Sequence, residues 1–490
     1  MDVKWWMVIG TREIGAVLVI TVLLTSAVYA AQAVRSSILP YPIYRKTLNN
    51  GLDVVVIETP EFKNVLSYNT LVLAGARNET EPGKTGLAHL FEHILFRHRY
   101  RGEDGGYEHY MTLLGTHNNA WTWFDVTYYH PLTFAQNLYP RTTDFGPLPS
   151  IVELEADRFV RLDFTQKIFQ TEAGAVLGEY RRISSFPSLK MSEKLLALMF
   201  PHHSYGHTTI GYYEDVLDMP NEYAAALRFY RTYYRPNNVV LVIVGDVRAE
   251  DVFAQVSRYY TDWEPHATPP VRPKGTPPQT EQRAHVPWPA DVAPLVWVAY
   301  RMPAYRPGTV ESGVMDLLQE LLVSEAAPLY QRLRYEKQSV SLLNFAEGTR
   351  GFESFDPRVL IIQAQLYKDR FQQQGTAYFD EVIRDIVAGV EALQTFDRAP
   401  DAKQRLQILK SKFRYDFMAQ LSSPARIAEI FAWYYRFNRD PRVLDQVVRG
   451  VQRVRPKDVA AFARRYLIPE RRVILTLAYE PQSTSEESNP

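Results

Sequence analysis

The sequence predicts an α+β fold made of two duplicated halves, each with an antiparallel sheet packed on one side by helices. Three observations lead to this prediction. Segments with the apolar pattern of strands do not alternate strictly with long helical segments, as they would in a parallel βαβ fold. A proline-rich stretch near the middle divides the chain, and short segments before it correspond to segments after it.

The elements of this fold can be placed from apolar periodicity. A helix is expected over Leu87–Phe96, with Thr85 in the preceding glycine-containing loop as a plausible N-cap. A second segment, 151–183, is rich in helix formers and has apolar residues at helical spacing. Strands are expected at 52–57, 67–74 and 239–244 in the first half, and at 293–300, 359–365 and 473–477 in the second.

Length and proline content indicate two domains. About 450 of the 490 residues remain once the N-terminal segment is set aside, which is too many for one hydrophobic core. Prolines recur between Trp263 and Pro289, which is the composition of a stiff linker. The predicted organisation is a leader at 1–33, a first domain at 38–263, a linker at 264–289, a second domain at 290–482 and a disordered polar tail at 483–490.

The N-terminal segment sets the expected compartment. Lys4 and Arg12 precede an uncharged run that ends in small residues, the layout of a secretory signal peptide. The alternative is an uncleaved membrane anchor, since the run is about long enough to span a bilayer. Either interpretation puts the protein outside the cytoplasm, in the periplasm or secreted, and the absence of cysteine fits an oxidising compartment. Basic and acidic residues number 55 each, so nothing indicates nucleic-acid binding.

The strongest functional signal is the motif HLFEH at residues 89–93. His89 and His93 lie four residues apart and share one face of a helix, where two neutral imidazoles can bind Zn²⁺. Glu92 would then lie beside the open position of the metal, where a water is activated. The order H-x-x-E-H is the inverzincin pattern. The alternative is a helix with two incidental surface histidines and a glutamate in a salt bridge.

A third metal ligand is available in the second helical segment. Glu172 and Glu179 lie seven residues apart, two turns along one helical face. Glu179 follows a run of small apolar residues, and a carboxylate among such neighbours needs a partner, which a metal can be. The alternative is that both glutamates are solvated.

An internal comparison restricts the metal site to the first half. Residues 85–95 correspond to 312–322, and the motif positions have become Asp316, Gln319 and Glu320. Without histidine this copy makes a poor zinc site, and an amide cannot act as a general base. One Zn²⁺ per chain is therefore expected.

HxxEH followed by E-x6-E resembles the M16 family of zinc metallopeptidases, which includes pitrilysin, insulinase and mitochondrial processing peptidase. The resemblance spans about residues 40–480 and implies two α/β rolls that face each other as a clamshell. It assigns zinc to the positions of His89, His93 and Glu179, the general base to Glu92 and a supporting role to Glu172. Further matching stretches are 119–122, 155–158, 205–207, 210–211 and 234–246.

The segment 119–129 indicates how a polypeptide substrate could bind. It is rich in Trp, Tyr and Thr and has the composition of a strand. At a sheet edge beside the metal, it could take an extended peptide through main-chain hydrogen bonds. The expected substrate-binding residues here are Asn119, Ala120 and Thr122. Trp121, Trp123 and Tyr128 could line side-chain pockets or pack in the core.

One departure from the family concerns the second half. Family members often carry there an Arg and, seven residues later, a Tyr that hold the substrate near the metal. Arg334 is present and is an expected substrate-binding residue, but Ser341 takes the Tyr position and is too short to replace a phenol. Some bacterial members divide the work between a zinc subunit and a metal-free subunit that bears the Arg/Tyr pair. We therefore expect such a partner subunit, or a homodimer.

Two function classes follow from these observations. The first is a zinc endopeptidase that cuts unfolded or short polypeptides outside the cytoplasm. The second is a non-catalytic M16-like assembly or chaperone-like subunit. Loss of the Arg/Tyr pair is the only support for the second class, and an intact Glu92 argues against that class.

Overall fold

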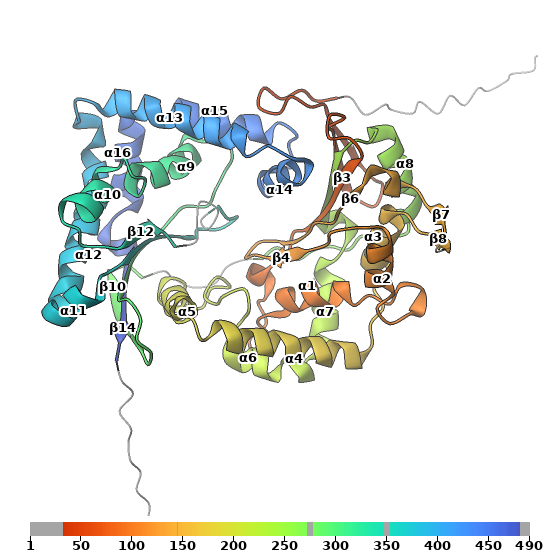
Figure 1. Cartoon of the computed structure of the whole chain (residues 1–490), viewed down its shortest axis with the longest axis horizontal. Helices are drawn as coiled ribbons and strands as arrows, with labels where there is room; N and C mark the ends of the chain where they lie inside the picture. The colour runs from red at the N-terminus through yellow and green to blue at the C-terminus, as the bar shows by residue number, and fades with distance from the viewer. Residues whose placement is uncertain (1–32, 145, 272–277, 347–352, 481–490) are drawn as a thin grey trace, which may run out of the picture. The chain divides into compact units, whose positions relative to one another are not determined.

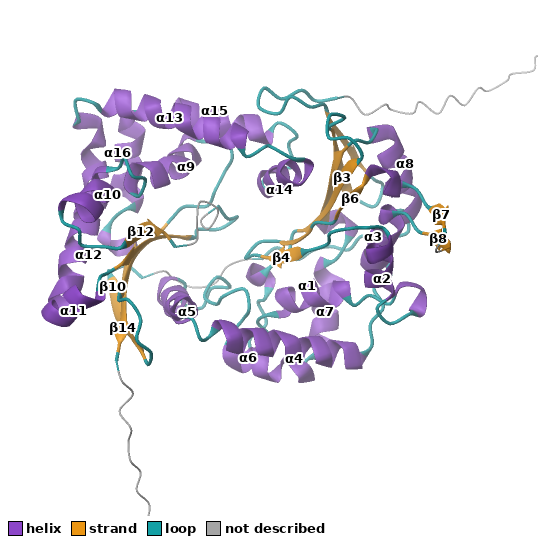
Figure 2. Cartoon of the chain, viewed as in Figure 1, coloured by secondary structure: helices purple, strands orange, loops and turns teal. Residues whose placement is uncertain are grey.

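The computed structural model describes residues 33–144, 146–271, 278–346 and 353–480. Two large sheets with their helices make up most of this part of the chain (Figure 1 and Figure 2). The predicted leader, apart from its last residue, and the predicted tail lie outside the described residues. Among the helices that are described, none combines the length and the apolar character needed to cross a bilayer.

The first sheet is built from the N-terminal half. Strand β9 enters between β2 and β3, parallel to β2 and antiparallel to β3. Every residue of β9 is buried, which explains its unbroken run of valine, leucine and isoleucine. In spatial order the strands are β1 (Ile43–Thr47), β2 (Asp53–Glu58), β9 (Val239–Gly245), β3 (Val65–Val72), β5 (Thr127–Tyr129) and β4 (Ala120–Thr122), with β6 (Leu132–Phe134) also paired to β3. A separate small sheet pairs β7 (Arg141–Thr143) with β8 (Gly146–Leu148).

The second sheet repeats this arrangement in the C-terminal half. Strand β14 enters between β10 and β11, parallel to β10 and antiparallel to β11, as β9 does between β2 and β3. The same strand order and the same parallel pair confirm the predicted duplication of the fold. In spatial order the strands are β10 (Gln282–Trp288), β14 (Arg472–Tyr479), β11 (Leu295–Arg301), β13 (Val359–Gln365) and β12 (Leu342–Phe345).

Two details differ from the prediction. The sheets are mixed rather than purely antiparallel, because the last strand of each half inserts between two strands that run in opposite directions. Residues Gln282–Trp288, which the sequence analysis places in the linker, form strand β10 and belong to the second sheet. The six expected strands all form, with ends that differ by no more than a few residues.

The helices surround these sheets. The predicted helical segment 151–183 forms two helices, because the chain turns after Val160 and Thr165 then caps the second helix, its hydroxyl accepting a hydrogen bond from the Ile168 amide at 3.1 Å. In the first half the helices are α1 (Leu87–Phe96), α2 (Gly106–Leu113), α3 (Ile151–Val160), α4 (Gln166–Ile183), α5 (Pro187–Met199), α6 (Tyr213–Asp218), α7 (Tyr223–Tyr233) and α8 (Ala249–Tyr260). In the second half they are α9 (Val310–Leu322), α10 (Pro328–Tyr330), α11 (Lys368–Gln374), α12 (Thr376–Glu391), α13 (Ala402–Ala419), α14 (Pro424–Tyr435), α15 (Val443–Arg453) and α16 (Pro456–Tyr466).

Each half lends one helix to the sheet of the other. Helix α5 packs against β10 and β14, and Leu195 of α5 shares a buried apolar cluster with Leu475 of β14. Helix α14 packs against β3 and β9 in return. At its end the Tyr435 hydroxyl donates a 2.8 Å hydrogen bond to the buried carboxylate of Asp53 on β2. The two halves therefore share their cores.

Candidate metal centre

Helix α1 carries the HLFEH motif and coincides with its predicted span. Leu90, Phe91 and Ile94 are fully buried, so the opposite face of the helix points its polar residues toward α4. The predicted N-cap is wrong: Gly86 occupies that position, and the Thr85 hydroxyl donates to Asp215 instead.

The start of α1 is held by a carboxylate from outside the helix. The two oxygens of Glu79 accept hydrogen bonds from the amides of Gly86 and Ala88, at 2.8 and 2.7 Å. A carboxyl group at this position satisfies amides that have no partner within the helix. Sequence analysis missed Glu79, because a cap from a residue outside the helix leaves no local pattern.

Helices α1 and α4 bring His89, His93 and Glu179 together. The Glu179 Oε2 atom lies 3.6 Å from His89 Nε2 and 3.7 Å from His93 Nε2. All three candidate ligand atoms lie within 4.8 Å of one another. Among the described residues, this is the one group of three or more His, Cys, Asp or Glu side chains close enough to hold a metal ion.

These distances fit zinc. Ligands bound at about 2.0–2.1 Å in a tetrahedral site stand roughly 3.4 Å from one another, close to the two nitrogen–oxygen distances observed. Two imidazoles and one carboxylate leave a fourth position open, which is the donor set of a catalytic rather than a structural site. Burial, and then the neighbouring His93, lower the pKa of His89 to about 3, so this imidazole is neutral and has a lone pair to offer a metal.

Glu172 lies behind this group and orients His93. Its Oε2 atom is 3.5 Å from His93 Nδ1, and its Oε1 atom accepts a 2.8 Å hydrogen bond from Arg97 Nε. Burial alone would raise the pKa of Glu172, but the contacts with His93 and Arg97 outweigh it and hold that pKa below its usual value. A carboxylate on the far nitrogen of a ligating histidine fixes the ring and increases its basicity.

Glu92 is held in place by Thr122 of strand β4. The Thr122 hydroxyl donates a 2.6 Å hydrogen bond to Glu92 Oε2. Burial raises the pKa of Glu92, whereas the bond from Thr122 opposes that shift. The Thr122 hydroxyl is thus engaged with the Glu92 carboxylate, and substrate binding by Thr122, through its main chain on β4, stays a prediction.

The segment 119–129 forms a hairpin of β4 and β5 rather than one strand. The turn at residues 123–126 contains no glycine or proline that would have marked it. Strand β4 is the edge of the first sheet, as the prediction requires. Asn119 and Ala120 lie at its start, and the Asn119 side chain accepts from the Ala120 amide at 2.9 Å.

The aromatic residues of this hairpin divide between core and cavity. Tyr128 is 1% exposed, and Trp121 packs against it and against Trp433 of α14. These two residues therefore take the core-packing alternative. Trp123 lines a cavity of about 340 Å³ together with His89 and Glu179. Its other walls combine hydroxyl side chains with apolar ones, namely Ser188, Ser192, Thr208 and Thr209 with Phe124, Ile183, Phe186, Leu189, Leu196 and Ile210.

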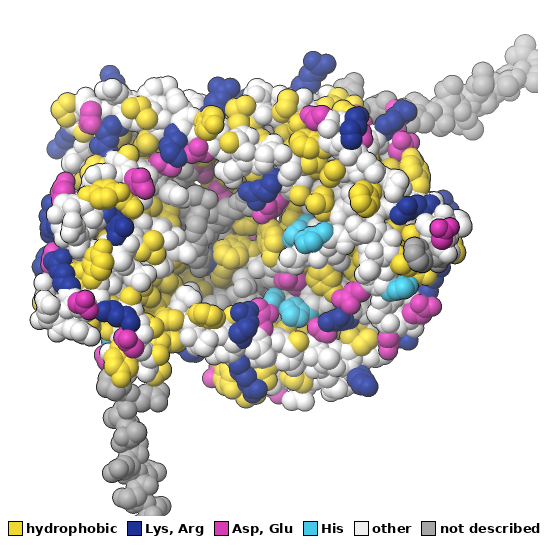
Figure 3. Space-filling model, viewed as in Figure 1, with side chains coloured by type: hydrophobic (Ala, Val, Ile, Leu, Met, Phe, Trp, Pro, Cys, Tyr) yellow, Lys and Arg dark blue, Asp and Glu magenta, His cyan; other side chains and the backbone are white. Residues whose placement is uncertain are grey.

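The face shown in Figure 3 is hollowed near its centre. Hydrophobic side chains form much of the floor of this hollow, and histidine and acidic side chains lie at its edge.

In the second half, the residues that correspond to the HLFEH motif make contacts with other side chains of that half. Both oxygens of Asp316 accept from the Tyr305 hydroxyl at 3.0 Å, and Glu320 pairs with Lys412 at 2.9 Å. Arg334 donates to the carbonyl of Val340 at 2.6 Å, in its own half of the chain. The structure thus does not bring Arg334 into contact with the zinc ligands.

Two family models match consecutive parts of this chain. The model for insulinase (peptidase family M16) matches residues 54–212, which contain the HLFEH motif and Glu179. The model for the peptidase M16 inactive domain matches residues 222–397. The chain belongs to peptidase family M16. The insulinase model lies within the first half, whereas the inactive-domain model begins in the first half, near the start of α7, and ends in the second half.

Relatives of this M16 protein include bacterial proteases. The zinc protease PqqE of Helicobacter pylori is 26% identical over 428 residues, which cover 86% of this chain and 89% of that protein. The crystal structure of a protease from Helicobacter pylori matches with a TM-score of 0.76 and 23% identity, covering 89% of this chain and 99% of that chain. The periplasmic protease PqqL from Escherichia coli matches with a TM-score of 0.69 and 16% identity, covering 92% of this chain but 48% of that chain. At these identities the solved structures support the fold alone.

Proposed function

We propose that this M16 protein is a zinc-dependent endopeptidase, with one Zn²⁺ per chain, that hydrolyses unfolded or short polypeptides outside the cytoplasm. The observation that carries the proposal is the convergence of His89, His93 and Glu179, whose ligand atoms lie within 4.8 Å of one another. Glu92, one residue before the second histidine, supplies a carboxylate beside them.

In the proposed reaction, Glu92 and Glu172 have distinct roles. Zinc, when bound, supplies a Lewis acid for the scissile carbonyl and for the attacking water. Glu92 accepts the proton of that water and returns it to the leaving amine. Its raised pKa suits both steps, because a base that holds its proton more firmly is also a competent acid near neutral pH. Glu172 keeps His93 in the orientation that faces Glu179.

The edge strand β4 supplies the binding surface. Its outer side pairs with no other strand among the described residues, so an extended peptide can add there through main-chain hydrogen bonds. Asn119 and Ala120 are the proposed contacts with the peptide main chain, and the adjoining apolar cavity receives a side chain. Recognition through main-chain atoms favours polypeptides that are unfolded or short.

Cleavage of an unstructured peptide by the zinc-loaded chain tests this function. Wild type should cleave, chelation of the metal should abolish cleavage, and readdition of zinc should restore it. Glu92→Gln should reduce kcat by several orders of magnitude while the protein still binds one zinc ion. Gln319→Ala, at the corresponding position of the second half, is the matched control and should behave as wild type. A zinc-loaded wild type as inert as Glu92→Gln, with every candidate partner added, would instead support a non-catalytic assembly subunit.

The proposal extends to location, partner and domain boundaries. We propose a periplasmic or secreted enzyme whose N-terminal segment is a signal peptide or an anchor, with a first domain at 38–263 and a second domain that begins with β10.

Ser341, whose hydroxyl donates to the Gln365 carbonyl at 3.1 Å, gives no phenol that could stabilise the oxyanion of the reaction. A partner subunit with an Arg/Tyr pair, or a second copy of this chain, would then supply the missing group. If the purified monomer reached full activity with no gain from such a partner, this part of the proposal would fail.

A further inference from the structure

A second cavity, of about 600 Å³, lies at the N-terminal end of the zinc helix α1. None of its lining residues is a proposed zinc ligand, and it borders the carboxylate of Glu79 that caps the helix. Its walls come from the loop that precedes α1, from residues 202–207 and from the start of α6. A volume of this size is typical of sites for small molecules.

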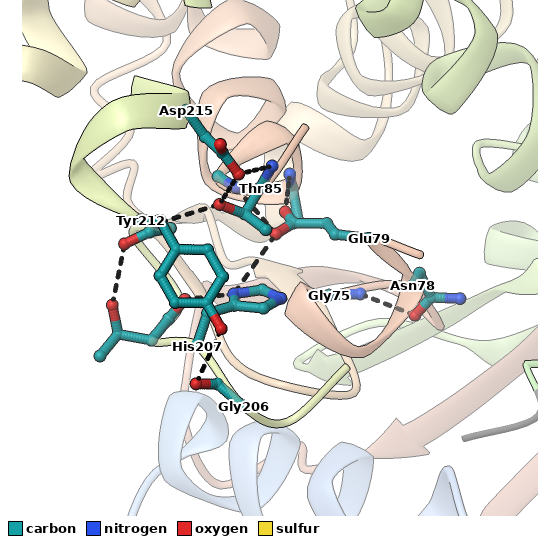
Figure 4. A network of polar contacts seen from close by, with 12 residues as sticks. Gly75, Asn78, Glu79, Thr85, Gly206, His207, Tyr212 and Asp215 are labelled. Carbon is teal, nitrogen blue, oxygen red and sulfur yellow. Dashed lines mark hydrogen bonds and ion pairs between the residues drawn. The ribbon is translucent and has the colours of Figure 1, made fainter. Parts of the chain in front are cut away.

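A network of hydrogen bonds and ion pairs connects residues around this cavity (Figure 4). Asp215 accepts from both the amide and the hydroxyl of Thr85, at 3.1 and 2.7 Å. The Tyr212 amide donates to the same hydroxyl at 2.8 Å, and the Tyr212 side chain donates to the Gly206 carbonyl at 3.1 Å. These bonds fix the shape of the wall.

Two wall residues, His207 and Ser204, each have a buried polar atom without a hydrogen-bond partner among the described residues. His207 is 3% exposed, and its Nδ1 atom lies 2.8 Å from the Thr208 carbonyl. Because a carbonyl only accepts, Nδ1 carries the proton and Nε2 keeps its lone pair. Among the described residues no hydrogen bond reaches His207 Nε2, and the buried Ser204 hydroxyl, also in the wall, has none either. A buried acceptor without a donor is costly, which points to a ligand that donates there.

The composition of the wall indicates the charge of that ligand. Glu81 and Asp215 contribute carboxylates, Glu79 adds a carboxyl group whose pKa burial raises to about 8, and Arg228 pairs with Glu81 at 2.9 Å from outside the cavity lining. No Lys or Arg is among the described residues that line the cavity. Burial lowers the pKa of His207, and it lowers that of His203, another wall residue, to about 4, so these imidazoles add no positive charge. The cavity is therefore rich in hydrogen-bond acceptors and acidic side chains.

A metal ion is not the expected occupant. In the part of the chain that the structure describes, only His89, His93 and Glu179 form a group of three His, Cys, Asp or Glu side chains whose ligand atoms are close enough to share a metal ion. The acceptors of this cavity are spread around a larger volume, which suits an organic cation with N–H donors.

We propose that this cavity is a second ligand site, which binds a small organic cation through a primary ammonium group that donates to His207 Nε2 and Ser204 and is balanced by the surrounding carboxylates. The site is independent of the zinc chemistry, but the two are neighbours. Thr208, Thr209 and Ile210, which directly follow His207, line the cavity beside the zinc ligands.

Two probes of equal charge test the proposal on the full zinc-loaded chain. Ligand-observed NMR titration should detect saturable binding of n-butylammonium. The n-butyltrimethylammonium ion carries the same charge and chain but no N–H donor, and it should bind at least about tenfold more weakly, since hydrogen bonds to charged groups contribute that much. Equal binding of the two ions, or no saturable binding of n-butylammonium, would overturn the proposal and leave water as the occupant.

Substitutions of the two wall residues test where n-butylammonium binds. His207→Leu should weaken n-butylammonium at least about tenfold, and Ser204→Ala, the milder change, about threefold or more. His109→Ala, which removes an exposed histidine from α2, is the control and should bind as wild type. If His207→Leu does not fold, Ser204→Ala decides the question. Unchanged affinity in a folded Ser204→Ala variant would place the cation elsewhere and refute the assignment.

Discussion

The hydrogen bond from Thr122 to Glu92 offers a direct test of how the proposed general base is controlled. Thr122→Val keeps the shape of the side chain and removes the hydroxyl, which lies 2.6 Å from Glu92 Oε2. A hydrogen bond to a charged group contributes about 1.5–3 kcal/mol, and this one stabilises the ionised carboxylate only. Since one pKa unit corresponds to about 1.4 kcal/mol, its loss should raise the pKa of Glu92 by roughly 1–2 units.

The sign of this shift predicts a particular pH profile. Glu92 must be ionised to accept a proton, so the acidic limb of kcat/KM should move upward by roughly 1–2 pH units in Thr122→Val. The rate should fall about 10- to 100-fold on that limb and much less at high pH. The assay is hydrolysis of a quenched fluorescent peptide by zinc-loaded enzyme across the pH range. Thr122→Ser restores the hydroxyl and should restore the profile.

The reasoning fails if Thr122→Val and wild type share one acidic limb. A uniform loss of rate at all pH values would also count against it, because that result indicates a displaced substrate rather than a perturbed carboxylate. Zinc content measured on each variant separates both outcomes from loss of metal.

Three further predictions concern the scaffold around the site. Tyr435→Phe should lower the free energy of unfolding by about 1.5–3 kcal/mol in urea titrations, because it leaves the buried Asp53 without that donor, whereas the exposed Tyr415→Phe should change little. Arg97→Ala should weaken zinc binding about 10-fold or more in competition with a chelator, since it releases the carboxylate that orients His93. Burial raises the pKa of Glu79 from 4.5 to about 8, so its contribution to stability is present below pH 4.5 and is lost as pH rises through about 8. Glu79→Gln should therefore flatten the fall in urea midpoint between pH 5 and pH 9, and an unchanged fall would refute this assignment.

Local patterns in the sequence predicted the elements that carry the site. Helix α1 has the predicted span because its apolar residues recur at helical spacing, and β9 was recognisable as a continuous apolar run. The close approach of Glu179 to the two histidines also agrees with the sequence-based hypothesis. These features depend on residues near one another in the chain or on a motif with fixed spacing.

Features that depend on tertiary contacts could not be predicted. The cap from Glu79 and the bond from Thr122 to Glu92 join segments that no periodicity connects. The parallel pairs also escaped prediction, because the insertion of β9 between β2 and β3 is a property of the whole half. Arg97 could have been found from sequence, since it directly follows α1 and can reach the same side as His93.

The exchange of α5 and α14 means that the half with the proposed zinc ligands does not form an independent folding unit. A fragment ending before β10 would contain all three proposed zinc ligands, yet α5 would lose the strands β10 and β14 that support it. Residues of α5 line the cavity next to His89, so that cavity would lose a wall. The same fragment would expose the face of β3 and β9 that α14 covers, which is a surface prone to aggregation. The second half thus supports α5, which forms one wall of the cavity beside the proposed zinc ligands, and this gives a physical reason for retaining both copies in one chain.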